Sequence, residues 1–376
     1  MRILLAEDSA ASRFLLRHAV EELGHECIVA EDGLRAWELF RRDHAEVVIS
    51  DWIMPGLDGD ELCRRIRADA RSAYTYFVML TSLEDKEFVL RGMQAGVDDY
   101  LTKPLDRNDL AARLIAASRV TALHHQIAEQ QRELENEVAM AAGIQRGLLP
   151  AEPPQVAGAE LAGVCLPAAN IGGDYYDFLL DEQGRLVLLI ADVAGHSIGS
   201  ALLMAMARSV LRREVAEGAL PAAVLGATNR AMYADLVTAG LFITMFCVIY
   251  DPADGRLTFA NAGHNPPLLQ RPDAPGLELD ADGAAIGFLE DVEFEERTET
   301  LGPGDALLLY TDGAVEAQDP RGEQFGEERL ADLVAAMAPA GSEALVRAVV
   351  DTLNDFTGGA HQGDDITVVA LRRTSG

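Results

Sequence analysis

Residues 185–192 read RLVLLIAD, an apolar run typical of a buried strand that ends in Asp192. Three further aspartates stand beside comparable runs: Asp312 follows ALLLYT, Asp174 precedes YYDFLL, and Asp364 precedes DITVVAL. We therefore expect all four carboxylates where a buried strand reaches the surface. No cysteine or histidine cluster rivals them, and carboxylate oxygens are the ligands that Mg²⁺ and Mn²⁺ prefer. The pattern predicts hard-metal chemistry.

The surroundings of these aspartates indicate an antiparallel fold. From residue 150 to 373, strand-like runs surround two helical stretches, at residues 200–217 and 221–237. The strand-like runs are LAGVCL, DYYDFLL, RLVLLIAD, FITMFCVIY, RLTFANAG, PPLLQ, DALLLYT and DITVVAL. Strands, then helices, then strands again predict antiparallel sheets covered by helices, an α+β sandwich.

Residues 1–118 have a different pattern, in which short apolar runs alternate with amphipathic stretches. The strand-like runs are RILLA, ECIVA, VVIS, YFVML and DDYLTKP. Five strands alternating with five helices predict an α/β domain with a doubly wound parallel sheet. Functional groups of such sheets collect beyond the carboxyl ends of the strands, which is where Asp8, Asp51, Thr81 and Lys103 fall.

Residues 119–149 join the two regions and contain no strand-like stretch. Apolar or small residues recur there at spacings near three and four, as in a heptad seam. The seam consists of Val120, Leu123, Ile127, Gln130, Leu134, Ala141, Ile144 and Leu148. Gln130, Glu137 and the His124–His125 pair weaken it. We expect a homodimer through a coiled coil of this linker helix. The alternative is a solvated helix that packs on its own N-terminal domain. Pro150, Pro153 and Pro154 end the helix.

The bulk composition limits the possible partners. At 376 residues the chain is long enough for two domains and a connector. Its formal net charge of -30 argues against nucleic acid or an anionic membrane as a partner, because phosphate binding requires clustered Lys and Arg. Two acids interrupt MRILLAED before a signal peptide could form, and no apolar run approaches the ~18 residues of a membrane span. A cytoplasmic protein is expected.

The four cysteines are expected to be reduced core thiols. Cys27, Cys63, Cys165 and Cys247 are scattered along the chain, without a CxxC pair and mostly in apolar surroundings. Such spacing is typical of neither a disulfide framework nor a zinc site.

The N-terminal acids predict a phosphoryl-transfer site. Glu7, Asp8 and Asp51 converge at strand ends, so their carboxylates crowd together unless a divalent cation neutralises them. Asp51 can then act as a nucleophile toward a phosphoryl group and form an aspartyl-phosphate. Lys103 would pair with the phosphoryl oxygens, and Thr81 would turn its hydroxyl toward them.

These residues resemble the response-regulator receiver family, in which ILLAED, ISDWIMPGLDG, MLTS and DDYLTKP stand at the family's spacings. The resemblance implies that Asp51 is the phosphoacceptor for a sensor histidine kinase. It also implies an Mg²⁺ ion held by Glu7, Asp8, Asp51 and the backbone carbonyl of Ile53, and a cis bond before Pro104. The implied receiver switch consists of Thr81, Lys103 and Tyr100.

The C-terminal region is similar to the metal-dependent serine/threonine phosphatases of the PP2C superfamily, in the bacterial sporulation and stress-response branch. The motifs are NIGGDYYDF, ADVAGHSIGSALLMA, ANAGHNPPLL, LYTDGAVEA and GDDITVVAL. The resemblance implies two Mn²⁺ or Mg²⁺ ions bridged by Asp192. Asp312 and Asp364 would hold the first ion, and Asp174 with the carbonyl of Val193 would hold the second. Asp365 is an adjacent alternative to Asp364.

Two histidines and a serine lie beside these motifs. His196 and His264 could act in catalysis, but a hydrogen bond that organises a loop is the preferred interpretation of both. Ser197 stands where the family usually has glycine, and a left-handed backbone conformation is costlier for serine.

The order of parts favours a phosphorylation-controlled phosphatase: a switch domain, a long helix, then a catalytic domain. The resemblance implies a phosphoserine or phosphothreonine on an anti-sigma-factor antagonist as substrate. The alternative is an adaptor whose phosphatase-like domain binds a partner without catalysis. Degenerate domains of that kind lack the metal-binding acids, which this chain retains. A nucleotide-cyclase or DNA-binding output is disfavoured, because no basic helix-turn-helix is present and the chain is acidic.

Overall fold

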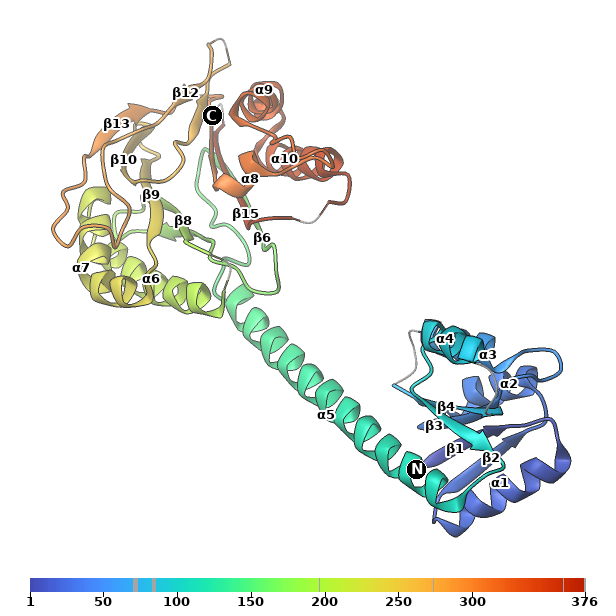
Figure 1. Ribbon diagram of the computed structural model, residues 1–376. Coiled ribbons are helices and arrows are strands. Elements are labelled where there is room, and N and C mark those ends of the chain that lie inside the picture. Colours follow the sequence, from blue (N-terminus) through green and yellow to red (C-terminus); the bar gives the residue numbers. More distant parts are fainter. Residues whose placement is uncertain (70–73, 83–85, 196, 273, 361, 375–376) are drawn as a thin grey trace. The chain divides into compact units, whose positions relative to one another are not determined.

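The structure is a computed structural model that describes residues 1–69, 74–82, 86–195, 197–272, 274–360 and 362–374. It divides into two compact units, residues 1–135 and 136–376, both drawn in Figure 1. Each unit is described by itself. Within the described residues, every helix is too short or too polar to span a lipid bilayer.

The first unit is built on a five-stranded parallel sheet with strand order β2-β1-β3-β4-β5. Its elements alternate between strand and helix along the chain: β1 (Arg2–Ala6), α1 (Ala10–Glu22), β2 (Glu26–Ala30), α2 (Gly33–Asp43), β3 (Val47–Asp51), α3 (Gly59–Ala68), β4 (Tyr76–Ser82), α4 (Lys86–Ala95), β5 (Asp99–Lys103) and α5 (Arg107–Arg146). The predicted doubly wound sheet is confirmed.

Both faces of this sheet are buried, which explains the continuous apolar runs of its strands. Successive side chains of a strand point to opposite faces. Leu4 and Phe77 accordingly pack into a core with α2 and α3. Ile3 and Val78 pack into a second core with α1 and the start of α5.

The second unit contains two antiparallel sheets, with strand orders β13-β10-β9-β8-β7 and β12-β11-β14-β15-β6. Its elements are β6 (Ala159–Leu166), β7 (Tyr175–Leu180), β8 (Leu186–Val193), α6 (Ile198–Ala216), α7 (Pro221–Ala239), β9 (Ile243–Asp251), β10 (Arg256–Ala262), β11 (Leu268–Gln270), β12 (Leu277–Glu278), β13 (Arg297–Thr300), β14 (Ala306–Tyr310), α8 (Asp312–Glu316), α9 (Glu327–Met337), a 3-10 turn (Ala338–Ala340), α10 (Ser342–Thr357) and β15 (Ile366–Arg373).

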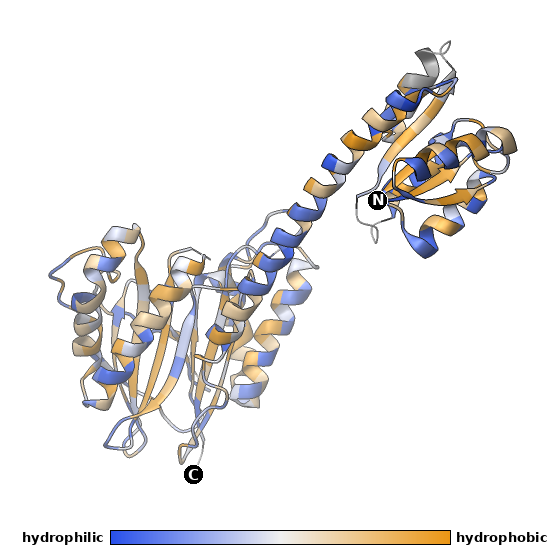
Figure 2. Cartoon of the chain, turned by 90° about the horizontal axis from the view of Figure 1, so that it is seen from below, coloured by the Kyte–Doolittle hydropathy of each residue, from blue (hydrophilic) through white to orange (hydrophobic). Residues whose placement is uncertain are grey.

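The two sheets stack face to face, and helices cover both outer faces. Leu188, Phe246 and Leu307 belong to the core between the sheets. Helices α6 and α7 pack on one sheet through a second core, and α9 and α10 pack on the other through a third. Figure 2 shows mostly hydrophobic strands between helices in which hydrophobic and hydrophilic residues are mixed. The predicted α+β sandwich is confirmed.

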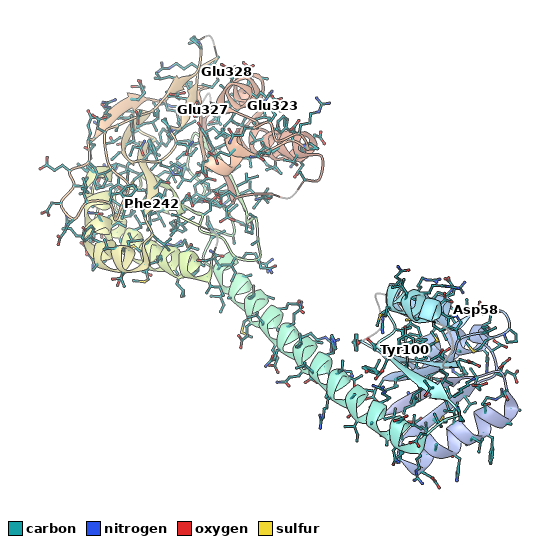
Figure 3. All side chains as sticks on the ribbon, in the orientation of Figure 1. Asp58, Tyr100, Phe242, Glu323, Glu327 and Glu328 are labelled. Atoms are coloured by element: carbon teal, nitrogen blue, oxygen red, sulfur yellow. The ribbon has the colours of Figure 1, made fainter. Side chains whose placement is uncertain are left out.

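Helices α8, α9 and α10 were not predicted, although the sequence signals α9 and α10. Leu330 and Val334 of α9, and Leu345, Val349 and Leu353 of α10, are buried at the four-residue spacing of a helical face. Figure 3 shows two glutamates of the first turn of α9, where the helix dipole favours negative charge.

Helix α5 contains the predicted linker 119–149 up to Arg146. Its first turns pack on the parallel sheet through Leu110, Leu114 and Ala117. Beyond them, the ring of His124 stacks on Tyr74 with 3.8 Å between the ring centroids. Several apolar side chains of the predicted seam are exposed, namely Leu123 (57%), Ile127 (50%), Leu134 (59%) and Ile144 (65%). The coiled coil stays a prediction.

The cysteines fit the expected reduced thiols. All four are free, and Cys63 and Cys247 are fully buried. Burial raises the pKa of Cys27, Cys63 and Cys165 to about 12, so none of these three forms a thiolate near neutral pH.

Candidate functional site

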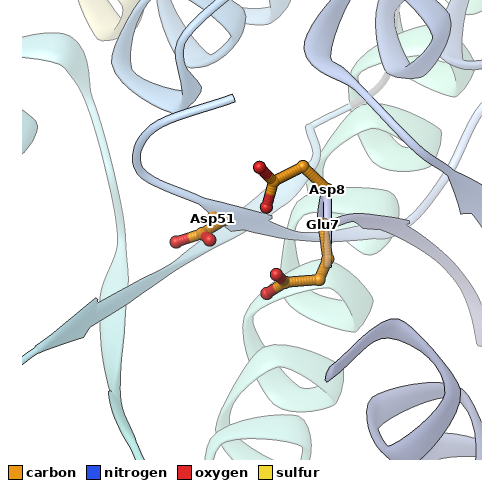
Figure 4. A group of neighbouring side chains, drawn as sticks. All are labelled: Glu7, Asp8 and Asp51. Atoms are coloured by element: carbon orange, nitrogen blue, oxygen red, sulfur yellow. The ribbon is translucent and has the colours of Figure 1, made fainter. Parts of the chain in front are cut away.

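Three acids gather at the carboxyl ends of β1 and β3 in the first unit (Figure 4). Glu7, Asp8 and Asp51 each offer a carboxylate oxygen within 4.8 Å of the others. Glu7 is buried, Asp51 is half-buried and Asp8 is exposed. Three carboxylates this close repel one another unless a cation lies between them, and an all-oxygen set suits Mg²⁺. The residues present therefore fit the expected ion.

Lys103, at the end of β5, closes this site from the side. Its Nζ donates to Glu7 Oε2 at 2.9 Å and to Asp51 Oδ2 at 2.7 Å. Burial lowers the pKa of Lys103, but the hydrogen bonds to Asp51 and Glu7 outweigh it, so the pKa is raised and the ammonium group persists. A fixed cation beside Asp51 is what a phosphoryl group on that residue would require.

The other residues of the predicted receiver switch lie on the neighbouring strands. Thr81 stands near the end of β4, next to β5. Tyr100, labelled in Figure 3, lies on β5 beneath α4. A Cβ atom at Gly92 of α4 would meet the Tyr100 hydroxyl at 2.4 Å, so α4 packs directly on this ring. The Lys103–Pro104 bond is cis, as expected.

Asp192 of β8 is the electrostatic centre of a second acidic site, in the second unit. Burial first, and then the charges of Asp312, Asp364 and Asp365, together raise its pKa to about 7. The pKa of Asp312 is likewise raised, first by burial and then by Asp364 and Glu316. The sequence-predicted acids therefore face one another across strand ends that are distant in sequence.

Asp174 is more deeply buried than expected for a residue at a strand end. Its side chain is only 3% exposed, and its Oδ2 accepts hydrogen bonds from the hydroxyls of Thr311 at 2.8 Å and Thr367 at 2.6 Å. Burial, followed by the charges of Asp192 and Asp365, raises its pKa well above the ordinary value, although both hydroxyls oppose this shift. The two threonines hold the carboxylate in one orientation.

The structure separates the roles of Asp364 and Asp365. The buried carboxylate of Asp365 accepts hydrogen bonds from the backbone N–H groups of Ala168 at 2.8 Å and Gly173 at 2.6 Å. Asp364 is half-buried and lines a pocket instead. Asp365 thus holds the loop before β7, whereas the carboxylate of Asp364 remains available to a cation.

The glycine pair before Asp174 fits tightly among these groups. A Cβ atom at Gly172 would lie 2.2 Å from Asp365 Oδ2, and one at Gly173 would lie 2.3 Å from the carbonyl oxygen of Val193. Only glycine allows the loop to approach both groups so closely. The carbonyl of Val193, an expected metal ligand, therefore borders the loop that carries Asp174.

Sequence reasoning missed Gln145, in the last turn of α5. Its Nε2 donates to the carbonyl oxygen of Gly172 at 2.6 Å, and its Oε1 accepts from the N–H of Gly172 at 3.1 Å. One side chain therefore satisfies both backbone groups of the glycine next to Asp365. The motif GIQRGLLP contains this glutamine, but no local pattern reveals a partner 27 residues away.

The structure describes two of the three other residues that the sequence singled out. His264 Nδ1 and the hydroxyl of Thr244 are 2.8 Å apart, and Thr244 pairs with Asp192 across β8 and β9. Burial lowers the pKa of His264 to about 4, so the ring is neutral near pH 7. The loop itself is held by the backbone N–H of His264, which donates to Asn261 Oδ1. Ser197 has an ordinary φ of -107° and caps α6 by accepting from Ser200 N. His196 lies outside the described residues.

The residues of the second site suit divalent cations. Its candidate ligands offer only oxygen donors, and burial followed by neighbouring carboxylates raises the pKa of Asp174, Asp192 and Asp312. A cation bound there would supply the compensating charge. Among the described residues, no three of these acids come as close together as the N-terminal triad does. A site shared between two cations spreads its ligands more widely.

Comparison with known proteins agrees with both sites. Residues 3–115 match the response regulator receiver domain, and residues 182–374, about half of the chain, match the stage II sporulation protein E (SpoIIE) family. A parallel receiver sheet followed by a PP2C-type sandwich with an acidic site defines a response regulator with a serine/threonine phosphatase output domain. The chain belongs to the SpoIIE family.

The similar proteins share the phosphatase half. RsbU of Bacillus subtilis, named a phosphoserine phosphatase, is 31% identical over 255 residues, which cover 66% of this chain and 74% of RsbU. The SiaA-PP2C domain of Pseudomonas aeruginosa is 27% identical with a TM-score of 0.58, covering 65% of this chain and 99% of that structure. The structure of the RsbU and RsbW domains of Rv1364c from Mycobacterium tuberculosis is 32% identical with a TM-score of 0.53. The match covers 60% of this chain and 63% of that structure.

Proposed function

We propose that this protein is a response regulator in which phosphorylation of Asp51 controls a metal-dependent phosphoserine and phosphothreonine protein phosphatase. The observation that carries the proposal is the mutual repulsion of Asp192, Asp312 and Asp364, because it leaves a site whose charge calls for divalent cations. PP2C-type phosphatases depend on such metals.

We assign two Mn²⁺ or Mg²⁺ ions to the phosphatase site. Asp192 would contact both ions, Asp312 and Asp364 would hold the first, and Asp174 with the carbonyl of Val193 would hold the second. Bound there, the ions would supply Lewis acidity and a water molecule of lowered pKa. Asp365, Thr311 and Thr367 act as positioning residues, since they hold the loop and the Asp174 carboxylate through hydrogen bonds.

The reaction we assign is direct hydrolysis of a phosphate monoester. The water oxygen forms a bond to phosphorus, the bond between phosphorus and the serine oxygen breaks, and that oxygen takes up a proton. The proton that the attacking water loses passes to solvent, because the carboxylates around Asp192 are assigned to the cations. His264 is neutral and buried, so we give it no proton-transfer role.

The likeness to RsbU, a phosphoserine phosphatase, supports a phosphorylated anti-sigma-factor antagonist as substrate. On the input side, a sensor histidine kinase would phosphorylate Asp51, with Mg²⁺ held by Glu7, Asp8, Asp51 and the carbonyl of Ile53. Lys103, Thr81 and Tyr100 would then respond to the new phosphoryl group.

Helix α5 is the element through which we connect the two sites. It begins after the receiver sheet, and its last turn contains Gln145, whose amide holds Gly172 beside Asp365. A change in the position or pairing of this helix therefore acts directly on the loop that carries Asp174. The exposed seam residues support a homodimer through α5.

The test is Mn²⁺-dependent hydrolysis of p-nitrophenyl phosphate and of a phosphorylated antagonist protein, with and without beryllofluoride, which mimics phosphorylation of Asp51. We expect turnover that is lost in Asp192→Ala, and a beryllofluoride effect that is lost in Asp51→Ala. An adaptor without catalysis would hydrolyse neither substrate, and calorimetry would then show no Mn²⁺ binding that depends on Asp192.

A further inference from the structure

A pocket of about 470 Å³ opens beside Asp364 in the phosphatase domain. Its walls come from α8, the end of α10 and the segment before β15. Leu353 and Ile366 give it an apolar side, whereas Asn354 and Thr357 are polar. The volume lies in the range of roughly 300–1,000 Å³ that is usual for ligand sites, so the pocket can hold a long side chain.

The charged residues that line this pocket are all acidic. Glu316 and Asp364 are among its lining residues, and no lysine or arginine is among those that the structure describes. Glu316 has no ion-pair partner in the described part of the chain, although other exposed glutamates of this domain, such as Glu323 and Glu343, are paired. Once Asp364 is bound to a cation, Glu316 is the remaining uncompensated charge.

The pocket adjoins the place where the phosphate is hydrolysed. It contains Asp364 and also Gly313, which follows Asp312 in α8. Consecutive residues of an extended peptide are about 3.3 Å apart, so a residue close to a phosphoserine bound at Asp312 and Asp364 can place its side chain here. The apolar side suits a methylene chain, and Glu316 suits a cationic end group.

We propose that this pocket binds the side chain of a lysine or arginine that lies close in sequence to the phosphoserine of the substrate. The proposal rests on the proposed phosphatase function and adds a determinant of its substrate specificity. It differs from the general attraction that an acidic protein exerts on basic peptides, because that attraction does not depend on the position of the basic residue and is screened within ~10 Å at 0.1 M salt.

The experiment compares phosphoserine peptides of neutral sequence with a single lysine at each position from three before to three after the phosphoserine. Each has a partner peptide with norleucine, an uncharged side chain of similar length, at the same position. We expect kcat/KM to be about fivefold higher for lysine than for norleucine at one position or two adjacent ones, mostly through KM, as an exposed ion pair allows.

The matched variants are Glu316→Gln and Glu343→Gln. Glu343 is an exposed glutamate of α10 that pairs with Arg347 and does not line the pocket. The ratio of lysine to norleucine should fall to about one in Glu316→Gln and stay at its wild-type value in Glu343→Gln. Because the ratio compares two peptides on one variant, a general change in activity does not affect it.

Two results would overturn the proposal: a preference for lysine that is equal at all positions, or one that survives in Glu316→Gln. If the wild type hydrolyses p-nitrophenyl phosphate without any positional preference among the peptides, only the pocket assignment fails. If it hydrolyses neither the small ester, nor the peptides, nor the phosphorylated antagonist protein, the proposed function fails, and the assignment of the pocket fails with it.

Discussion

Asp192 holds its proton more tightly than an ordinary aspartate, because burial and then the charges of Asp312 and Asp364 raise its pKa to about 7. In the unfolded chain its pKa returns to ~3.9. The folded, metal-free domain thus binds more protons between these values, so its free energy of unfolding falls as the pH rises from about 4 to 7.

We therefore expect the phosphatase domain, freed of metal with a chelator, to lose stability as the pH is raised through 7, and to lose less in Asp192→Asn. Calorimetric unfolding at several pH values measures this. Asp332→Asn, an exposed position on α9, serves as the control and should keep the wild-type slope. A metal-free wild-type domain that gains stability over the same range would contradict the assignment.

Gly172 is required by space, because a methyl group there would lie 2.2 Å from Asp365 Oδ2. Gly172→Ala should displace Asp365 and the loop that carries Asp174, at a cost of about 1–3 kcal/mol in unfolding free energy. The affinity for Mn²⁺, measured by calorimetry, should fall as well. Gly143→Ala is the matched control, because a methyl group on that side of α5 meets nothing within 4 Å. It should stabilise the helix by up to about 1 kcal/mol.

The candidate metal ligands could be predicted from the local sequence around each aspartate. The preference for Asp364 over the adjacent Asp365 could not. Each of the four aspartates stands beside an apolar run, which is a local signal. The choice of Asp364 over Asp365 depends on the N–H groups of Ala168 and Gly173, 197 and 192 residues earlier in the chain. The partner of Gln145 is non-local in the same way.

At the scale of elements, the side chain of Gln145 connects the last turn of α5 to the loop that carries Asp174, through hydrogen bonds to Gly172. Gln145→Ala removes two hydrogen bonds to Gly172, each worth about 1 kcal/mol. We expect the Mn²⁺ concentration for half-maximal activity to rise about tenfold, and the beryllofluoride effect to shrink. Gln131→Ala, whose amide contacts only Glu135 on the same helix, should leave both quantities unchanged. Equal effects of the two substitutions would contradict the role of Gln145.

The elements that were predicted correctly are mainly those whose buried side chains give the sequence an apolar pattern. Most strands of the three sheets were found because their side chains are buried in continuous runs, such as LVLLIAD in β8. The edge strands β12 and β13 were missed, since their residues are almost all exposed and carry no apolar pattern. Helix α10 was not predicted either, although its sequence carries a clear helical pattern, with Leu345, Val349 and Leu353 on its buried face.

At the scale of the whole molecule, dimerisation can be tested through the exposed seam of α5. Leu134 is 59% exposed at a core position of the predicted heptads, whereas Met140 is 70% exposed and off the seam. Leu134→Glu should convert the expected dimer into a monomer. Burying a charged side chain in the core of a coiled coil costs more free energy than the other apolar contacts of the seam contribute to dimerisation. Light scattering measures the mass, and Met140→Glu should remain dimeric. A wild-type monomer with and without beryllofluoride would end this prediction.

The uninterrupted α5 sets a rule for exchanging input domains. Each residue turns an α-helix by about 100°, so an insertion of seven residues changes the rotational phase of Gln145 by only ~20°, whereas an insertion of two reverses it. A different sensor grafted onto this helix would keep the phosphatase responsive when the junction preserves that phase, whatever the length of the helix. We therefore expect that an exchanged input domain controls the phosphatase only if the junction keeps the rotational phase of α5 between that domain and Gln145.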